Sequence, residues 1–382
     1  MIIAGEISGD MHAAALLREM RRLYPGQIEA YGIGGDHLAA EGMELYAHVD
    51  ETGVMGFWEV ARRFRFLGRL LKETKNLLDS RRPDLLLTVD YPGFNMRIAP
   101  QAKARGIRTV QFISPQVWIW NRKRIPKMVA TFDCLIPILP FEPAVFDGTG
   151  LKAVYVGNPL VDQVAAIRDE PRSDLPWGEG RRVALFAGSR KTEIQRILPG
   201  LVAAARLVEQ RVGPCSFILP SPSKATAALV REMLAKLPDK PAHIVPVEGE
   251  SRQVLLQAEA AVVKSGTGTL EASLLLCPSV IVYRVATVSY YIMKYVISGI
   301  NHVGLVNIVA DREVCRELLQ HDFTPQNLAD ELEKLLTDEP TRTRMLADMR
   351  EVNAALGEEG VAARAAALVL EELPPTLAAG EA

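Results

Sequence analysis

Two glycine-containing turns constrain the fold of this chain most, because each lies between an apolar run rich in β-branched residues and a helical pattern. The first turn is 187–190 (AGSR), after the run 183–186, and the second is 264–271 (KSGTGTLE), after the run 260–263. A strand, a turn and a helix in this order are typical of α/β folds, whose ligands bind at the carboxyl ends of the strands. Exposed N–H groups and the helix dipole favour an anion at such a turn. Each turn alone is equally consistent with a plain connection, but the pair predicts a diphosphate held between two helix N-termini.

The same alternation predicts two α/β domains in tandem. Strands are expected at 1–4, 28–32, 84–89, 108–113, 133–136 and 153–156, and then at 183–187, 216–219, 243–247, 260–263 and 279–282. A charged segment rich in Pro and Gly, 168–180, is typical of a linker, so we expect an N-terminal domain over 1–165 and a C-terminal domain over 181–351. The segment after about 324 has no strand candidate and is rich in helix formers. The strand 1–4 is short for a central strand: either it is that short, or the sequence omits a few residues before it.

Composition excludes several classes of protein. The chain has 382 residues, 48% of them apolar, and a net charge of −2, which argues against a general nucleic-acid binder. Its four cysteines are far apart and lack zinc-binding spacing, so we expect buried thiols in a reducing cytoplasm. There is no apolar run of about 18 residues and no signal-peptide pattern, so neither a membrane span nor export is expected.

Two further turns carry carboxylates at predicted strand ends. The first is 4–10 (AGEISGD), before a helix expected near Met11, and its candidate residues are Gly5, Glu6, Ser8, Gly9 and Asp10. Glycine lets the backbone approach a ligand, whereas Ser8 or Asp10 is equally suited to capping a helix. The second begins with Asp90, at the end of strand 84–89. This is a position at which a general base is held on rigid scaffold, although capping is again the alternative.

Two segments combine large apolar side chains with basic ones. In 57–72 the apolar residues recur at intervals of three and four with five basic residues between them, and 117–124 has two tryptophans beside basic residues. Either segment alone is consistent with a packed helix whose charged face is solvated. Together they favour a lipid headgroup interface. The residues expected at that interface are Val54, Met55, Phe57, Trp58, Arg62, Arg63, Arg65, Trp118 and Trp120.

Seven motifs occur in order along the chain. They start at residues 4 (AGEISGD), 54 (VMG), 90 (DYPGFN), 114 (SPQVWIW), 139 (LPFE), 188 (GSR) and 265 (SGTGTLE). With these motifs the chain resembles the lipid-A-disaccharide synthase family of glycosyltransferases over essentially its whole length. The resemblance implies a GT-B fold, in which two Rossmann-like domains face each other across a cleft and a last helix, about 352–382, crosses back to the N-terminal domain.

The resemblance also implies a reaction and its partners. The family transfers 2,3-diacylglucosamine from UDP-2,3-diacylglucosamine to 2,3-diacylglucosamine 1-phosphate (lipid X), with inversion, giving the β-1,6-linked disaccharide of lipid A and UDP. It implies no metal or other cofactor, no nucleic acid, and a peripheral location on the anionic cytoplasmic face of the inner membrane in a Gram-negative-type bacterium. The sequence does not decide the oligomeric state, for which a homodimer is one alternative. The residues themselves leave open another GT-B glycolipid transferase, a UDP-sugar epimerase, or a non-catalytic module that binds UDP-sugar or lipid.

The resemblance implies roles for individual residues. It implies that Asp90 is the base for the acceptor 6-hydroxyl, that Arg190 is essential near the donor phosphates and that Glu271 meets the uridine ribose. The donor-binding residues implied are Gly188, Ser189, Arg190, Ser265, Gly266, Thr267, Gly268, Thr269, Glu271 and Asn307. The chain departs from the family pattern at two positions, since many members have an aspartate where Gly93 stands and a proline where Val306 stands.

Overall fold

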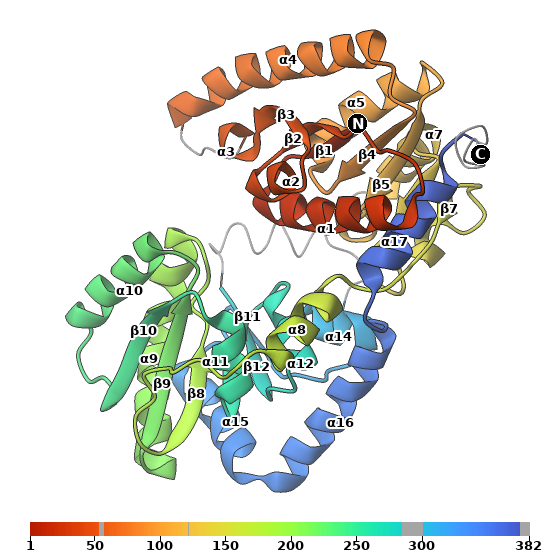
Figure 1. The fold of residues 1–382 in the computed structure, drawn as a ribbon. Coiled ribbons are helices and arrows are strands. Elements are labelled where there is room, and N and C mark those ends of the chain that lie inside the picture. Colours follow the sequence, from red (N-terminus) through yellow and green to blue (C-terminus); the bar gives the residue numbers. More distant parts are fainter. Residues whose placement is uncertain (53–56, 121, 285–300, 375–382) are drawn as a thin grey trace. The chain divides into compact units, whose positions relative to one another are not determined.

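The chain folds into two compact units, each built on one parallel β-sheet flanked by helices (Figure 1). The computed structural model describes residues 1–52, 57–120, 122–284 and 301–374, and for 52, 57–65 and 120 it describes the backbone alone. Unit 1 comprises Met1–Pro159 and Gly357–Ala382, and unit 2 comprises Leu160–Leu356. The expected α/β class is therefore confirmed.

Unit 1 contains a seven-stranded sheet in the order β3-β2-β1-β4-β5-β6-β7. Its strands are β1 (Ile2–Ala4), β2 (Tyr31–Gly34), β3 (Glu44–His48), β4 (Leu85–Val89), β5 (Arg108–Phe112), β6 (Cys134–Ile136) and β7 (Lys152–Ala153). Its helices are α1 (Ile7–Leu23), α2 (Asp36–Ala40), α3 (Val49–Thr52), α4 (Phe57–Ser80), α5 (Pro92–Lys103), α6 (Val117–Trp120), α7 (Ile125–Thr131) and α17 (Val361–Glu371), with 3-10 turns at Arg122–Arg124 and Pro143–Phe146.

Both faces of the unit 1 sheet are buried, as expected for parallel strands. Successive residues of a strand point to opposite faces. In β1, Ile2 and Ala4 therefore pack in the core that includes α1 and α17, whereas Ile3 packs in the core that includes α4 and α5. The short first strand is thus central and covered on both sides.

Unit 2 contains a six-stranded parallel sheet in the order β10-β9-β8-β11-β12-β13. Its strands are β8 (Arg181–Leu185), β9 (Cys215–Ser221), β10 (His243–Glu248), β11 (Ala260–Lys264), β12 (Ser279–Tyr283) and β13 (Glu317–Leu319). Its helices are α8 (Leu160–Asp169), α9 (Lys191–Val212), α10 (Lys224–Lys236), α11 (Ser251–Gln257), α12 (Gly268–Leu274), α14 (Leu305–Ala310), α15 (Pro325–Thr337) and α16 (Glu339–Ala355).

The boundary between the units lies at Pro159, earlier than the linker expected at 168–180. Three residues of that segment nevertheless bind unit 2. Ser173 Oγ donates to Glu250 at 2.9 Å, Trp177 Nε1 donates to Gln257 at 3.1 Å, and the N–H of Gly178 donates to Ser216 at 2.9 Å. The preceding residues 160–169 form α8, which also belongs to unit 2.

Helix α17 lies after unit 2 in the sequence but packs against α1 in unit 1, as the two adjacent ribbons in Figure 1 show. Ala365, Ala366 and Val369 of α17 are fully buried there. Just after the helix, the Glu372 carboxylate pairs with Arg108 and, at 2.9 Å, with Lys152. The return of the chain therefore completes one face of the first sheet.

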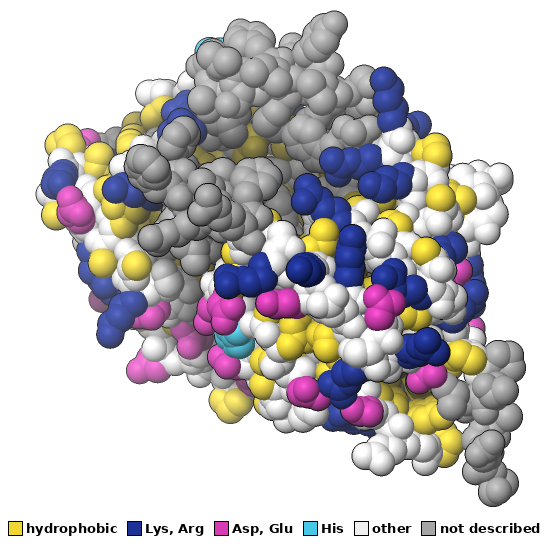
Figure 2. Space-filling view, turned by 90° about the horizontal axis from the view of Figure 1, so that it is seen from above, with side chains coloured by type: hydrophobic (Ala, Val, Ile, Leu, Met, Phe, Trp, Pro, Cys, Tyr) yellow, Lys and Arg dark blue, Asp and Glu magenta, His cyan; other side chains and the backbone are white. Residues whose placement is uncertain are grey.

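The surface carries charges of both signs, and Figure 2 shows Lys and Arg side chains among Asp, Glu and hydrophobic ones on one face. Among the helices the structure describes, none has both the length and the apolar composition needed to cross a bilayer. All four cysteines are buried as free thiols, which confirms the expected burial.

Candidate active site

In each unit the candidate residues gather where the strand order reverses. In unit 1 the chain moves along the sheet in one direction from β1 and in the other from β4, and in unit 2 the same holds for β8 and β11. Ligands of α/β sheets bind outside the carboxyl ends of the strands at such a reversal. The turns that follow these four strands are the ones that carry Gly5, Asp90, Gly188 and Gly266.

The two turns of unit 1 touch each other. A Cβ added to Gly5 would lie 2.2 Å from the ring of Tyr91, so only glycine fits between them. Gly9 faces the same turn, with its added Cβ 3.9 Å from the Cβ of Asp90. Gly5 therefore lets the first turn pack against the turn that holds Asp90, whereas a Cβ at Gly9 would make only ordinary contacts there.

The backbone around Asp90 is strained. Asp90 and Tyr91 have φ of 48° and 44°, in the left-handed region that non-glycine residues rarely adopt. The Asp90 carbonyl accepts hydrogen bonds from the side-chain amides of Asn95 at 2.5 Å and Gln111 at 3.2 Å, and its N–H donates to Phe112. Each such residue costs about 1–3 kcal/mol and persists only where the surroundings hold it, which is common at active sites.

The Asp90 carboxyl has a pKa raised from 3.8 to about 6. Burial is the main cause, the negative charge of Glu6 adds to it, and a hydrogen bond from the Tyr91 backbone opposes it. A carboxylate with a pKa near the working pH is better suited to accept a proton than an ordinary surface aspartate. Glu6 of the first turn is exposed and acts on Asp90 through its charge.

The rest of the first turn differs from the expectation. Helix α1 starts at Ile7, not near Met11, so Ser8, Gly9 and Asp10 lie in its first turn. Asp10 is buried, and its carboxylate accepts the N–H groups of Gly35 at 2.6 Å and Leu38 at 3.2 Å, together with that of His37. Asp10 therefore caps a helix, as the alternative interpretation held, but the helix is α2 and not its own. Ser8 is exposed.

Trp118 lies in the interior, which is a correction to its expected place at a lipid interface. Its side chain is 8% exposed, and its Nε1 donates to Glu142 Oε1 at 3.0 Å. The other oxygen of Glu142 accepts the N–H groups of Ile138 and Leu139. Burial raises the pKa of Glu142 to about 7, against these three hydrogen bonds, which lower it. The motif at 114–120 is thus tied to the motif at 139–142.

The other residues expected at the membrane cannot be placed. Val54 and Met55 lie outside the described residues, as do the side chains of Phe57, Trp58, Arg62, Arg63, Arg65 and Trp120. The backbone from Phe57 to Ser80 is the helix α4, as the periodicity predicts. Among the described residues, no group of three His, Cys, Asp or Glu side chains is arranged to hold a metal ion.

The first glycine turn of unit 2 joins β8 to α9. Gly188 has a φ of 107°, and Arg190 is the N-cap residue of α9 with a side chain that is 70% exposed. Glu193 Oε2 accepts the N–H groups of Ser189 at 3.3 Å and Arg190 at 3.4 Å, while its Oε1 pairs with Lys264 Nζ at 3.1 Å. Since β8 pairs with β11, this ion pair links the two glycine turns.

The second glycine turn joins β11 to α12 and is braced from within. Gly266 has a φ of 138°, and Thr269 Oγ1 donates to its carbonyl at 2.8 Å. Ser265 Oγ donates to the Val303 carbonyl at 2.7 Å. Thr267 is exposed, whereas Gly268 is half-buried with open space where a Cβ would stand. The hydroxyls of Ser265 and Thr269 thus hold the loop, and the loop's open side is formed by glycine backbone.

Asn307 is fully buried and its hydrogen-bonding groups are used inside unit 2. Its Nδ2 donates to the Cys315 carbonyl at 2.7 Å and to Glu317 at 2.9 Å, and its Oδ1 accepts the N–H groups of Val314 and Cys315. The neighbouring N–H of Val306 points to Thr269 Oγ1 at 3.4 Å, so the loop is connected to the glycine turn through an N–H group that a proline at this position would lack. In the described structure the side chain of Asn307 therefore fixes the segment 314–317 and not the glycine turn itself.

Glu271 borders a pocket of about 490 Å³ in unit 2. Its carboxylate accepts a hydrogen bond from Arg252 Nε at 2.8 Å, and Arg252 also binds Gln163 of α8. Ser173, Glu250 and Gln253 line the same pocket. Its volume lies within the range of small-ligand pockets, and Glu271 connects it to the second glycine turn.

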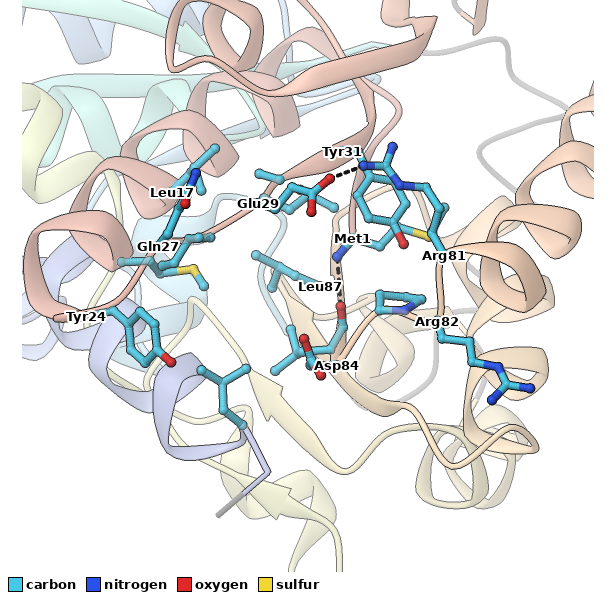
Figure 3. Close-up of a pocket in the computed structure, with 17 residues that line it drawn as sticks. Met1, Leu17, Tyr24, Gln27, Glu29, Tyr31, Arg81, Arg82, Asp84 and Leu87 are labelled. Carbon is cyan, nitrogen blue, oxygen red and sulfur yellow. Dashed lines mark hydrogen bonds and ion pairs between the residues drawn. The ribbon is translucent and has the colours of Figure 1, made fainter. Parts of the chain in front are cut away.

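Sequence reasoning missed the residues that support the turns. Asn95 and Gln111 hold the strained carbonyl of Asp90, and Lys264 and Glu193 link the glycine turns. Gln111 is 21 residues from Asp90 and Lys264 is 71 residues from Glu193, so no local pattern signals these two pairs, whereas Asn95 lies within the motif that starts at residue 90. A second pocket, of about 310 Å³, lies at the opposite, amino ends of β1 and β4 between Met1, Tyr31 and Asp84 (Figure 3), and none of the predicted site residues lines it.

Comparison with known proteins gives a consistent result. The family model described as lipid-A-disaccharide synthetase matches residues 1–371. The lipid-A-disaccharide synthase of Anaeromyxobacter dehalogenans (strain 2CP-1) is 39% identical over 97% of this chain and 96% of its own length. Among solved structures, the calicheamicin glycosyltransferase CalG4 has a TM-score of 0.61 at 16% identity over 97% of this chain and 96% of its own. A UDP-GlcNAc 2-epimerase from Neisseria meningitidis, bound to UDP-GlcNAc, has a TM-score of 0.61 at 10% identity, over 97% of this chain and 98% of its own. At such low identity the two structures are evidence of the fold alone.

Proposed function

Since the chain belongs to the lipid-A-disaccharide synthetase family of glycosyltransferases, we propose that it transfers 2,3-diacylglucosamine from UDP-2,3-diacylglucosamine to the 6-hydroxyl of 2,3-diacylglucosamine 1-phosphate with inversion. The products are the β-1,6-linked disaccharide 1-phosphate and UDP. The observation that carries the proposal is Asp90 of unit 1, which combines a strained backbone with a carboxyl of raised pKa and packs beside the turn of Gly5. Unit 2 of the same chain holds the two linked glycine turns.

In the proposed reaction the Asp90 carboxylate accepts the proton of the acceptor 6-hydroxyl while the oxygen of that hydroxyl attacks the anomeric carbon of the donor. The bond from that carbon to the diphosphate breaks as the new glycosidic bond forms, so one displacement inverts the configuration. Because proton transfer accompanies attack, a carboxylate within hydrogen-bonding distance is a sufficient base. Gly93, next to Pro92, leaves Asp90 as the base of this turn.

The donor is assigned to unit 2. Negative charge grows on the diphosphate as it leaves, and the exposed Arg190 at the start of α9, with the N–H groups of its turn, is suited to stabilise it. A preorganised donor of this kind is typically worth about 10²–10³ in rate. Glu271 and its pocket are assigned to the uridine.

The test is transfer by the purified protein in detergent, with both products followed and the anomeric configuration read by NMR. The native chain should form the β-linked disaccharide, and Asp90→Asn should lose nearly all of it while still binding UDP. Asp84→Asn is the matched control, because Asp84 is an exposed carboxylate at the other end of β4 and should leave transfer unchanged. UDP binding without disaccharide, or conversion of the UDP-sugar to an epimer, would contradict the proposal.

We propose further that the protein binds anionic membranes peripherally through the beginning of α4. The support is the basic and aromatic composition of 57–72, a helix of the required length in this structure, and substrates that carry acyl chains. Arg62→Glu with Arg65→Glu should release the protein from vesicles of phosphatidylglycerol and leave UDP binding intact. Equal retention of the variant on the vesicles would contradict membrane binding through α4.

We also propose that the protein is a homodimer. Light scattering of the purified protein tests this, and the mass of a single chain would contradict it.

A further inference from the structure

The site proposed for the donor diphosphate contains an internal anion. Glu193 places one carboxylate oxygen against the N–H groups of Ser189 and Arg190 and the other against the Lys264 ammonium. Its Oε1 is also 3.5 Å from Arg190 Nη1. The carboxylate thus lies among two successive N–H groups and two cationic side chains, which is the environment in which proteins bind phosphate groups.

The contacts made by this carboxylate are weak enough to be exchanged. The two backbone hydrogen bonds measure 3.3 and 3.4 Å, at the long end of the range for N–H···O bonds. The side chains of Glu193 and Lys264 are 16% and 24% exposed, so solvent reaches both groups. A diphosphate carries more charge than one carboxylate and therefore competes well for the same cations.

The geometry also keeps the three side chains together. A Cβ added to Gly188 would lie 2.8 Å from Glu193 Oε2 and 3.6 Å from Lys264 Cδ, so glycine is what lets the carboxylate reach the turn. Lys264 is the last residue of β11, directly before the second glycine turn. Burial alone would raise the pKa of Glu193, but the bond to Lys264 and the backbone N–H groups lower it, so Glu193 is ionised at neutral pH.

We propose that Lys264 is a ligand of the donor diphosphate and that Glu193 holds this lysine in place until the diphosphate replaces the carboxylate. This inference rests on the proposed function, which assigns the UDP-sugar to unit 2. The ammonium group of Lys264 thus has two partners in turn: the Glu193 carboxylate in the free enzyme and a phosphate oxygen in the UDP-sugar complex. Only hydrogen bonds and ion pairs change in this exchange, and no covalent bond does.

The experiment is a double-mutant cycle of UDP binding by calorimetry, with uridine as the ligand that lacks phosphate. Lys264→Met should weaken UDP binding about tenfold, the order of one charge-assisted hydrogen bond, and leave uridine binding unchanged. Glu193→Gln should bind UDP at least as tightly as the native chain, because the competing anion is gone. The double variant should remain about tenfold weaker than Glu193→Gln.

The double variant separates two explanations. If Lys264 only neutralises Glu193, the double variant will bind UDP as tightly as Glu193→Gln, which would overturn the inference. Weaker binding by Glu193→Gln than by the native chain would also overturn it. Lys236→Met is the matched control, because it removes an ion pair 2.5 Å long on the exposed face of α10 and should change nothing.

Controls for folding and for the proposed function are separate. Each variant should keep the native unfolding temperature within a few degrees, and Lys264→Arg should recover most of the UDP binding if Lys264→Met folds poorly. Absence of UDP binding and of disaccharide formation in the native chain would contradict the proposed function. A native chain that binds UDP and forms disaccharide, with Lys264→Met equal to it in UDP binding, would overturn this inference alone.

Discussion

At the scale of single residues, Asp90 shows how the fold prepares a base. If Asp90 accepts the acceptor proton, only its ionised form is active, and its pKa of about 6 places the change near neutral pH. We expect kcat/KM for transfer to rise tenfold per pH unit below about 6 and to level off above it. The measurement is a pH profile between 5 and 9 in one detergent. A profile flat through pH 6 would remove Asp90 from this role.

The raised pKa of Asp90 has a cost in stability. Because the folded pKa of about 6 lies above the unfolded value of 3.8, the ionised carboxyl destabilises the folded state, and stability falls as the pH rises through this window. The difference corresponds to at most about 3 kcal/mol at pH 8. Asp90→Asn should therefore unfold at a higher temperature than the native chain at pH 8 and at a similar one near pH 4. Asp84→Asn should show no such gain.

Asp10 provides a test of capping against ligand binding. Asp10→Ala leaves the buried N–H groups of Gly35 and Leu38 without their acceptor, so we expect a loss of about 1–3 kcal/mol in the free energy of unfolding. Ser8→Ala, in the same turn but exposed, should lose less than about 0.5 kcal/mol. Denaturant unfolding of both variants makes the comparison. Equal stability, with weaker substrate binding by Asp10→Ala, would favour the ligand interpretation.

At the scale of helices and strands, the sequence predicted most of the regular structure of each sheet. Runs such as 84–89 and 260–263 are apolar on both faces and flanked by turn residues, as buried parallel strands are. The strands β3 (Glu44–His48) and β13 (Glu317–Leu319) were missed, since each is partly exposed and carries charged or polar residues. The helical interpretation of the segment after 324 is confirmed for the described residues.

The positions of the candidate turns were predictable from local sequence. The turns at 4–10, 90–95, 187–190 and 264–271 lie where the strand order reverses, because a strand followed by a glycine turn shows in the sequence. The pairs that hold those turns were not predictable. Gln111 meets Asp90 only because β5 pairs with β4, and Lys264 meets Glu193 only because β11 pairs with β8. The boundary between the units at Pro159 precedes the segment 168–180, whose composition is that of a linker although three of its residues bind unit 2.

The hydrogen bond between Trp118 and Glu142 is expected to hold α6 in its position. Trp118→Phe removes the only side-chain donor that the buried Glu142 has in the described structure, so we expect a loss of about 1–3 kcal/mol. Trp177→Phe is the matched control, since its Nε1 binds the uncharged Gln257 at 3.1 Å. The control should lose less, because hydrogen bonds to charged groups are stronger. Equal losses, measured by chemical unfolding, would contradict a special role for Glu142.

At the scale of the whole molecule, α17 makes unit 1 depend on residues that follow unit 2. Ala366→Asp would bury an unpaired charge between α17 and α1, so we expect a loss of about 3 kcal/mol or more from unit 1. Calorimetry should show one transition lowered by roughly 6–12 °C and the other unchanged. Ala367→Asp, on the exposed side of the same helix, is the control. A single transition shifted as a whole would show that the units unfold together.

The position of α17 also orders events during synthesis. The chain leaves the ribosome from its first residue, and roughly 200 residues of unit 2 follow Pro159 before α17 is made. At about 5–20 residues per second this takes roughly 10–40 seconds. Throughout that interval the face of the first sheet that α17 covers stays open beside α1. Unit 2 can therefore be fully synthesised before the last helix of unit 1 is made. A nascent chain that stalls before residue 361 exposes an apolar surface to chaperones.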